Sequence, residues 1–224
     1  MRIYSYTKIK TKYGSLLLHN LDKLKDLDYI GLLRVLNKYG YLTILKPADF
    51  NNILKIEYSL RLREANTFFE LMKIYPKKLV PFLEGMFMFL DLYNINADPN
   101  YLIPTKYFNR YFIEQYKKDP SIIKRLPFYR ENKKDMELAL LKSIAQKVYP
   151  YYKELYKYVE SIEQGNPTNI IDEMEKDAKR FMAYPFYNDK PFIGFPLALE
   201  VETTKLSALI NEKYIEHLKK TKQL

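Results

Sequence analysis

The sequence contains no cysteine and no tryptophan, and it has only 6 glycines and 2 histidines among 224 residues. Without cysteine the chain forms no disulfide and performs no thiol redox chemistry, which suits a reducing compartment as well as a hot, oxidising one. His19 and His217 are too isolated to complete a zinc, di-iron or Ser-His arrangement. The glycines make no phosphate-binding loop. We therefore expect no catalytic site, no metal and no cofactor, and a protein that works by contact with partners.

Long apolar runs are also missing. One such run covers only residues 85–90, between Glu84 and Asp91, and a membrane-spanning helix needs roughly 20 such residues. The first residues lack the apolar core and the small-residue cleavage site of a secretory signal. These absences predict a cytoplasmic protein without a membrane span.

Positive charge and aromatic rings are abundant. The net charge is +10, and 22 tyrosines and 13 phenylalanines are interleaved with the basic residues, which is the composition of many nucleic-acid-binding proteins. However, the basic residues are spread along the chain in runs of no more than two or three. A codon bias toward A and T would produce a similar composition, so both explanations stay open.

The apolar spacing predicts an all-α fold, because no alternating pattern long enough for a sheet is present. One long helix is expected between Pro47 and Tyr75, with Tyr58, Leu62, Ala65, Phe69 and Met72 on its buried face. A wide apolar stripe over residues 78–95 predicts a helix at the centre of the fold. An unbroken three-and-four spacing over 134–164 predicts a second long helix, kinked at Pro150. The remaining helices are expected at 4–20, 28–38, 104–118, from Thr168 onward and at 194–220.

Several residues mark the ends of these helices. Asp28 is placed to cap the helix of 28–38, and Asp119-Pro120 ends the helix of 104–118. Gly165-Asn166-Pro167 stops the second long helix, because Gly and Asn tolerate the left-handed conformation and Pro cannot continue a helix. Residues 126–132 are expected to be irregular. We expect three segments, which are an N-terminal helical unit at 1–98, an irregular middle at 99–133 and a C-terminal helical unit at 134–224.

Two segments share one plan. Pro81-Phe82 leads into an apolar stretch that reaches Asp91 and Asn94, and Pro191-Phe192 leads into another that reaches Glu202 and Lys205. Such an echo is typical of stacked helical repeats, in which each unit buries its face on the next. We expect two to three such units.

The stretch from Phe192 to Ile210 resembles the closing helix of one family of rotary-ATPase proteins, the C-type stalk subunits of archaeal A-type ATP synthases and their d-type counterparts in V-type ATPases. Gly194 and Phe195 occupy the family's small and aromatic positions, and Glu200 and Glu202 form its Glu-x-Glu. Asp91 and Asn94 are similar to an Asp-x-x-Asn of the family's first repeat, and the segment from Tyr13 to Leu18 resembles its first helix. The resemblance covers about two thirds of the chain.

The chain also departs from the family pattern. Lys205 stands where the family often has Asn, and Pro196 interrupts a stretch that the family keeps aliphatic. The family chain is longer and carries three helical repeats around a pseudo-threefold axis, so the resemblance implies that much of one repeat is missing from the middle of this chain.

Helical spacing places Glu202 on one face with Phe195, Leu199 and Leu206, so its carboxylate is expected to be buried. A buried carboxylate needs a partner, which Lys205 or an arginine from another repeat would supply. Asp91 and Asn94 are interpreted as capping or turn residues. Glu200 is expected at the surface or facing a partner, the two histidines at the surface, and a solvated acidic face is expected at Asp172, Glu173, Glu175 and Asp177.

Two hypotheses follow. The resemblance implies a non-catalytic central-stalk protein that sits on the membrane rotor ring of a rotary ATPase, on the inner face of the membrane, and receives the foot of the soluble axle. Its positive charge would be scattered and would assist contact with anionic lipid headgroups. The alternative is a basic helical nucleic-acid-binding protein, whose Lys, Arg and Tyr would gather in one groove.

Overall fold

A computed structural model describes residues 2–165, 169–185 and 188–221. Within these ranges the chain is helical and forms no strand, so the all-α prediction is confirmed. The α-helices are α1 (Arg2–Gly14), α2 (Leu21–Lys25), α3 (Tyr29–Lys38), α4 (Ile53–Met72), α5 (Val80–Phe87), α6 (Phe89–Asn96), α7 (Arg110–Lys118), α8 (Lys133–Val148), α9 (Glu154–Glu163), α10 (Ile170–Met182) and α11 (Lys190–Thr221). The 3-10 helices are η1 (Leu17–Asn20), η2 (Pro47–Asn51), η3 (Lys77–Leu79), η4 (Pro99–Tyr101) and η5 (Pro120–Arg125).

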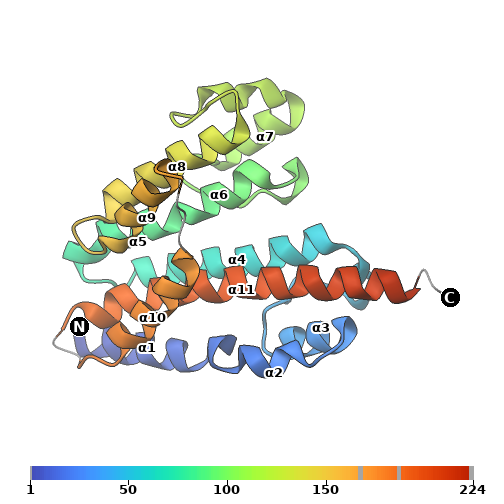
Figure 1. Ribbon diagram of the computed structural model, residues 1–224, viewed down its shortest axis with the longest axis horizontal. Helices are drawn as coiled ribbons and strands as arrows, with labels where there is room; N and C mark the ends of the chain where they lie inside the picture. Colours follow the sequence, from blue (N-terminus) through green and yellow to red (C-terminus); the bar gives the residue numbers. More distant parts are fainter. Residues whose placement is uncertain (1, 166–168, 186–187, 222–224) are drawn as a thin grey trace.

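The helices form two groups that lie one above the other in Figure 1. The lower group contains α1 to α4, α10 and α11, with α4 and α11 side by side. The upper group contains α5 to α9, with α8 packed on both α5 and α6. The packing therefore crosses the expected segment boundaries at residues 98 and 133, because α11 lies against α3 and α4 from the first segment.

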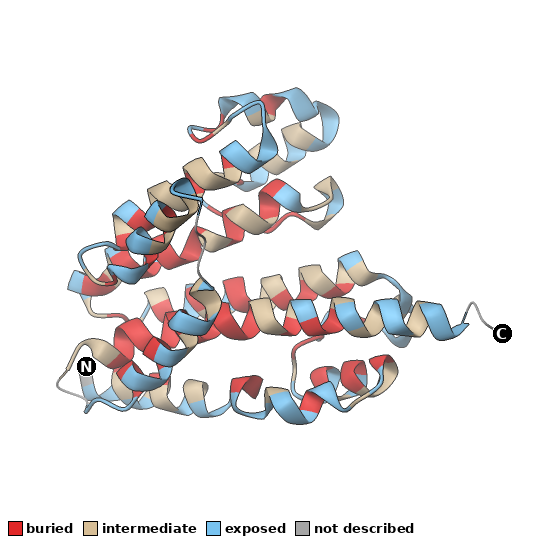
Figure 2. Cartoon of the chain, in the orientation of Figure 1, coloured by how far each residue is buried: buried red, intermediate tan, exposed pale blue. Residues whose placement is uncertain are grey.

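Helix α11 is the central element. Every residue from Pro191 to Thr203 is buried, and the red colouring of this half of the helix is clear in Figure 2. A helix that is buried all round needs partners on every side, and α11 contacts α1, α3, α4, α5 and α10. Further along, Leu206, Leu209 and Ile210 close a second, smaller core with side chains from η1 to α4.

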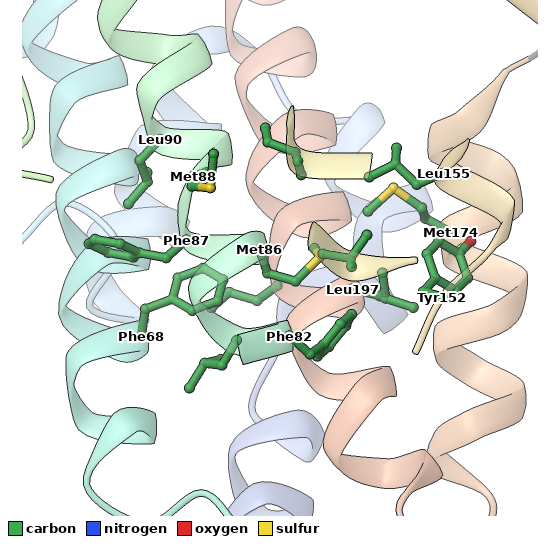
Figure 3. Packing of buried hydrophobic residues seen from close by; sticks show 14 of the residues in the cluster. Phe68, Phe82, Met86, Phe87, Met88, Leu90, Tyr152, Leu155, Met174 and Leu197 are labelled. Carbon is green, nitrogen blue, oxygen red and sulfur yellow. The ribbon is translucent and has the colours of Figure 1, made fainter. Parts of the chain in front are cut away.

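The main core joins the two groups of helices. Phe82 and Met86 of α5 lie between Phe68 of α4 and Leu197 of α11, as Figure 3 shows. Phe82 and Met86 are both fully buried, which confirms that the stripe of 78–95 is central. The path is not one uninterrupted helix, however, because α5 ends at Phe87 and α6 begins at Phe89, with Met88 between them.

The prediction of one kinked helix over 134–164 is wrong. Helix α8 ends at Val148 and α9 starts at Glu154, and an ion pair between Lys142 and Glu163 shows that the two run antiparallel. Pro150 lacks the backbone N–H that would continue the helix, and the amides of Tyr151 and Tyr152 both donate to the carbonyl of Val148 instead. The apolar spacing persists because both helices of the hairpin bury the same kind of face.

The buried face of α4 also differs from the prediction. Phe69 is 46% exposed, whereas Phe68 next to it is fully buried. The buried stripe includes the polar residues Ser59 and Glu64, so a search for apolar residues alone selects a neighbouring face. The helix itself starts at Ile53, after the separate 3-10 turn η2, and ends at Met72.

Other helix ends fall partly where they were expected. Asp28 caps α3, since its Oδ1 accepts from the amide of Gly31 at 2.7 Å, and Gly165 has the left-handed φ of 76°. In contrast, Pro104–Asn109 is not helical, and Gly14 ends α1 before η1 begins. Residues 126–132 are irregular, as predicted. The expected start of a helix at Thr168 lies outside the described residues.

Candidate functional site

Glu202 lies at the centre of a buried polar cluster between α4 and α11. Its carboxylate is fully buried and accepts from the guanidinium of Arg63 at 3.1 Å and from the hydroxyl of Tyr41 at 2.7 Å. The backbone amide of Leu18 donates to the same carboxylate at 3.2 Å. The prediction of a buried carboxylate paired with an arginine from elsewhere in the chain is therefore confirmed.

Burial raises the pKa of Glu202, while Arg63 and the hydrogen bond from Tyr41 lower it. The guanidinium carbon of Arg63 also lies 3.6 Å from the centroid of the Tyr41 ring, a cation–π contact. Burial, and then the negative charge of Glu202, raises the pKa of Tyr41, so the phenol keeps its proton. The cluster thus holds η1, α4 and α11 in one fixed arrangement.

Glu200 is buried as well, which contradicts the expectation that it is solvated or faces a partner. Its carboxylate accepts from Arg61 at 3.2 Å and from the hydroxyl of Thr204 at 2.8 Å. The same guanidinium lies 2.8 Å from Glu64. The sequence places Glu200 on another face than Glu202, but α11 is enclosed on both faces, so neither acid reaches solvent.

Arg61 therefore faces two buried carboxyl groups. Burial and the charge of Glu200 raise the pKa of Glu64 well above its ordinary value. Two carboxylates beside one guanidinium would leave an excess negative charge out of water, which is unfavourable. Both the burial and the neighbouring Glu200 therefore favour the protonated form of Glu64 beside Arg61.

Lys205 does not pair with Glu202. Its ammonium group lies 2.8 Å from Asp172 and 2.5 Å from Glu175, both on α10. The acidic face expected on α10 is therefore only partly solvated, and Asp177 is buried beside Arg180 at 2.5 Å. Helical spacing would also allow Lys205 to pair with Glu202, three positions earlier on α11. However, α10 packs closely along α11 and supplies acids that lie nearer to Lys205.

Gly194 explains that close packing. A Cβ atom at this position would lie 2.9 Å from Cβ of Phe181 and 3.1 Å from the carbonyl oxygen of Ala178. Phe195 is fully buried in the main core. The small and the aromatic position of the resemblance thus both serve packing around α11.

Asp91 and Asn94 are buried inside the upper group rather than capping a helix. The side chain of Asn94 donates to the carbonyl of Ile103 and accepts from its amide, both at 2.8 Å. The hydroxyl of Thr105 donates to Asp91, and its oxygen accepts from the amide of Phe108 at 3.0 Å. The pair therefore fixes the chain at 102–108 against α6. Burial raises the pKa of Asp91 to about 7.

The segment held in this way carries a concentrated positive charge. Residues 104–135 contain nine Lys or Arg against four Asp or Glu, so half of the net charge of +10 falls in one seventh of the chain. We call these nine residues the basic outer layer, and all of them are exposed. In the segment that carries them, α7 and η5 pack together at the outer edge of the upper group (Figure 1). They are Lys106, Arg110, Lys117, Lys118, Lys124, Arg125, Arg130, Lys133 and Lys134.

None of the nine forms an ion pair, although fourteen of the twenty-six other cationic side chains that the structure describes do so. If pairing were random over the chain, nine unpaired cations in succession would arise at most about once in a hundred cases. The basic outer layer is therefore set apart from the rest of the described surface, where about half of the lysines are paired with an acid of the chain.

A cleft of about 580 Å³ lies between η1, α2, α10 and α11. Its lining carries the cations Lys25, Lys179, Lys205 and Lys213 together with acids that partly neutralise them, Asp22, Glu175 and Glu212. His19 lines the cleft and is exposed, as predicted, whereas His217 is half-buried with its ring 5.4 Å from that of Tyr29. Within the described residues, no three acidic, histidine or cysteine side chains are placed to hold a metal ion.

Comparisons with models of known protein families, with curated proteins and with solved structures give no match to this chain. The resemblance therefore rests on the residues quoted for it. Among the described residues, no helix combines the length and the apolar character that a membrane span requires.

The sequence alone did not identify which residues pair with these acids. Arg61, Arg63 and Glu64 lie in the middle of a long apolar helix, and three charges so close together on such a helix were the available signal. The basic outer layer was also missed, because no part of it is a long basic run. Counting net charge over a window of about thirty residues would have found it.

Proposed function

We propose that this chain is a non-catalytic helical subunit of the central stalk of a rotary ATPase, joining a membrane rotor ring to a soluble axle. The observation that carries the proposal is the position of Glu200 and Glu202. The two acids of the motif that carries the resemblance form ion pairs with Arg61 and Arg63 on α4, so they hold α11 rigidly against α4. A part that transmits torque needs such stiffness, and chemistry is not required of it.

The architecture supports the same function. Helix α11 contributes to both hydrophobic cores, and the main core joins the two groups of helices, so a force applied to one group passes to the other through packed side chains. Asp91 and Asn94, the other motif residues, also hold backbone rather than face solvent. In each case the motif residues connect elements of the chain.

The experiment is a pull-down of the tagged full chain from its native membranes, washed at moderate salt, with the co-purifying proteins identified. Rotor-ring and axle subunits are the expected result. A matched variant, Glu202→Ala, removes the ion pair with Arg63 and should lose these partners, whereas the surface variant Lys220→Gln should retain them. Nucleic acid in the absence of any ATPase subunit would overturn the proposal.

The basic outer layer favours a second candidate, a nucleic-acid-binding protein. The stalk hypothesis expects scattered charge, whereas half of the net charge is gathered in residues 104–135. Binding through phosphates predicts an affinity that falls steeply with salt. Electrophoretic mobility shift with single-stranded and duplex probes, at two salt concentrations, tests this candidate directly.

A further inference from the structure

We propose that the basic outer layer is a docking surface for anionic phospholipid headgroups. The inference rests on the proposed function in one respect, since a subunit seated on a rotor ring lies beside a bilayer. Its physical basis is independent of that function. Nine exposed cations without an internal carboxylate partner attract a negatively charged surface, and each well-placed cation strengthens such an attraction severalfold at low salt.

The aromatic residues argue against single-stranded nucleic acid as the partner of this surface. Seven Tyr or Phe lie in residues 104–135, but six of them are buried or half-buried. Tyr107 packs edge-on against Phe128, and Phe112 packs against both Phe108 and Tyr116. Binding of single strands requires free rings on which bases stack, and here those rings belong to the core.

Tyr111 is the exception. It is 70% exposed and follows Arg110 at the start of α7. An exposed tyrosine among Lys and Arg is characteristic of residues at the membrane–water interface, where the ring lies at headgroup level. The other face of α7 carries Phe112, Ile113 and Tyr116, which pack on the main core. The helix therefore presents charge and one ring outward, as a surface contact requires, and has no apolar face left to insert.

Asp91 and Asn94 give this surface a fixed position. Through Ile103 and Thr105 they attach the start of the layer to α6, and the apolar side of α7 attaches its middle. The cations are thus presented by a folded surface, unlike those of a disordered basic tail.

The test is sedimentation of the full chain with vesicles of phosphatidylcholine alone or mixed with phosphatidylglycerol. Binding is expected only to the anionic vesicles and should decline as salt rises. The variant Lys117→Gln/Lys118→Gln should bind about thirty-fold more weakly. The matched control is Lys219→Gln/Lys220→Gln, because these lysines are also exposed and occupy the last turn of a helix; it should bind within about twofold of wild type.

Three outcomes overturn the inference. They are equal binding to neutral vesicles, equal losses in the two variants, and tighter binding to a nucleic-acid probe than to anionic vesicles under the same salt. A helical circular dichroism spectrum and an unchanged urea midpoint exclude misfolding of the variants. The pull-down separates the two proposals: vesicle binding without ATPase subunits retains this inference alone, and ATPase subunits without charge-dependent vesicle binding retain the stalk function alone.

Discussion

The hydroxyl of Tyr75 donates a hydrogen bond to the carbonyl oxygen of Phe192, four residues before Pro196 in α11. Proline has no backbone N–H, so the usual helical donor to this carbonyl is missing. Tyr75, in the turn that follows α4, takes its place. This relationship explains how a proline is accommodated in the most buried stretch of the chain.

Tyr75→Phe is expected to lower the free energy of unfolding by about 1 kcal/mol, because a buried hydrogen bond is lost. In the background of Pro196→Ala, which restores an N–H at the fourth residue, the same substitution should have a smaller effect. Urea unfolding of the four proteins in this cycle measures the difference. Equal effects of Tyr75→Phe in both backgrounds would show that the two residues are uncoupled.

Glu202→Ala should be strongly destabilising, by about 3–5 kcal/mol, because it leaves the half-buried Arg63 and the buried Tyr41 without their acceptor. Glu202→Gln keeps an acceptor oxygen and should lose less. Lys205→Gln provides the control, since its ion pairs with Asp172 and Glu175 lie nearer the surface and such pairs contribute about 1 kcal/mol or less. Denaturant midpoints rank the three variants. A small effect of Glu202→Ala would contradict the view that its ion pair with Arg63 holds α4 and α11 together.

Glu64→Gln should stabilise the protein at neutral pH. The pKa of Glu64 is raised in the folded state, so folding takes up a proton at pH values above the ordinary value of 4.5, and this uptake lowers stability as the pH rises. Glutamine has no such cost and still offers an oxygen to Arg61. Thermal unfolding at pH 4 and pH 7 should show the gain at pH 7 only; a gain of equal size at both would rule out a protonation effect.

Asp91→Asn should change how stability depends on pH. Because the pKa of Asp91 rises from 3.8 to about 7 on folding, the wild-type protein loses stability from about pH 4 to pH 7 and no further above it. Over that range the variant should gain relative to wild type by roughly 3 kcal/mol. Since Glu64 contributes with the same sign, the informative quantity is the difference between the two proteins at each pH.

Gly194→Ala should destabilise by about 1–3 kcal/mol, because the added methyl group would meet Phe181 and the backbone of Ala178. Gly14→Ala is the matched control, since a Cβ there meets nothing within 4 Å and the φ of Gly14 is not positive. That variant should be neutral or slightly stabilising. Comparison of the two melting temperatures separates crowding from the general effect of replacing glycine.

The sequence was most informative where structure is local. Asp28 caps its helix through an amide three residues away, and Gly165 closes a helix through its own backbone. Such features depend on a few neighbouring residues, so residue type and spacing are sufficient to predict them.

The errors concern relationships that are distant in the chain. The spacing of apolar residues around Pro150 does not show whether the chain continues or reverses, because both helices of a hairpin need the same buried face. Likewise, Glu200 looked like a surface residue because its enclosure depends on Arg61, 139 residues earlier. The net charge of the basic outer layer can be read from a window of the sequence, but its lack of ion pairs cannot, since unpaired and paired lysines look the same in a sequence.

The central place of α11 also constrains how the protein is made. Arg63 and its acid on α11 are separated by 139 residues, so at ribosomal rates of about 5–20 residues per second the arginine emerges roughly 7–28 s before its partner. During that interval α3 and α4 have no α11 on which to close their core. We expect the nascent chain to need a chaperone that shields these apolar faces until the final helix leaves the ribosome.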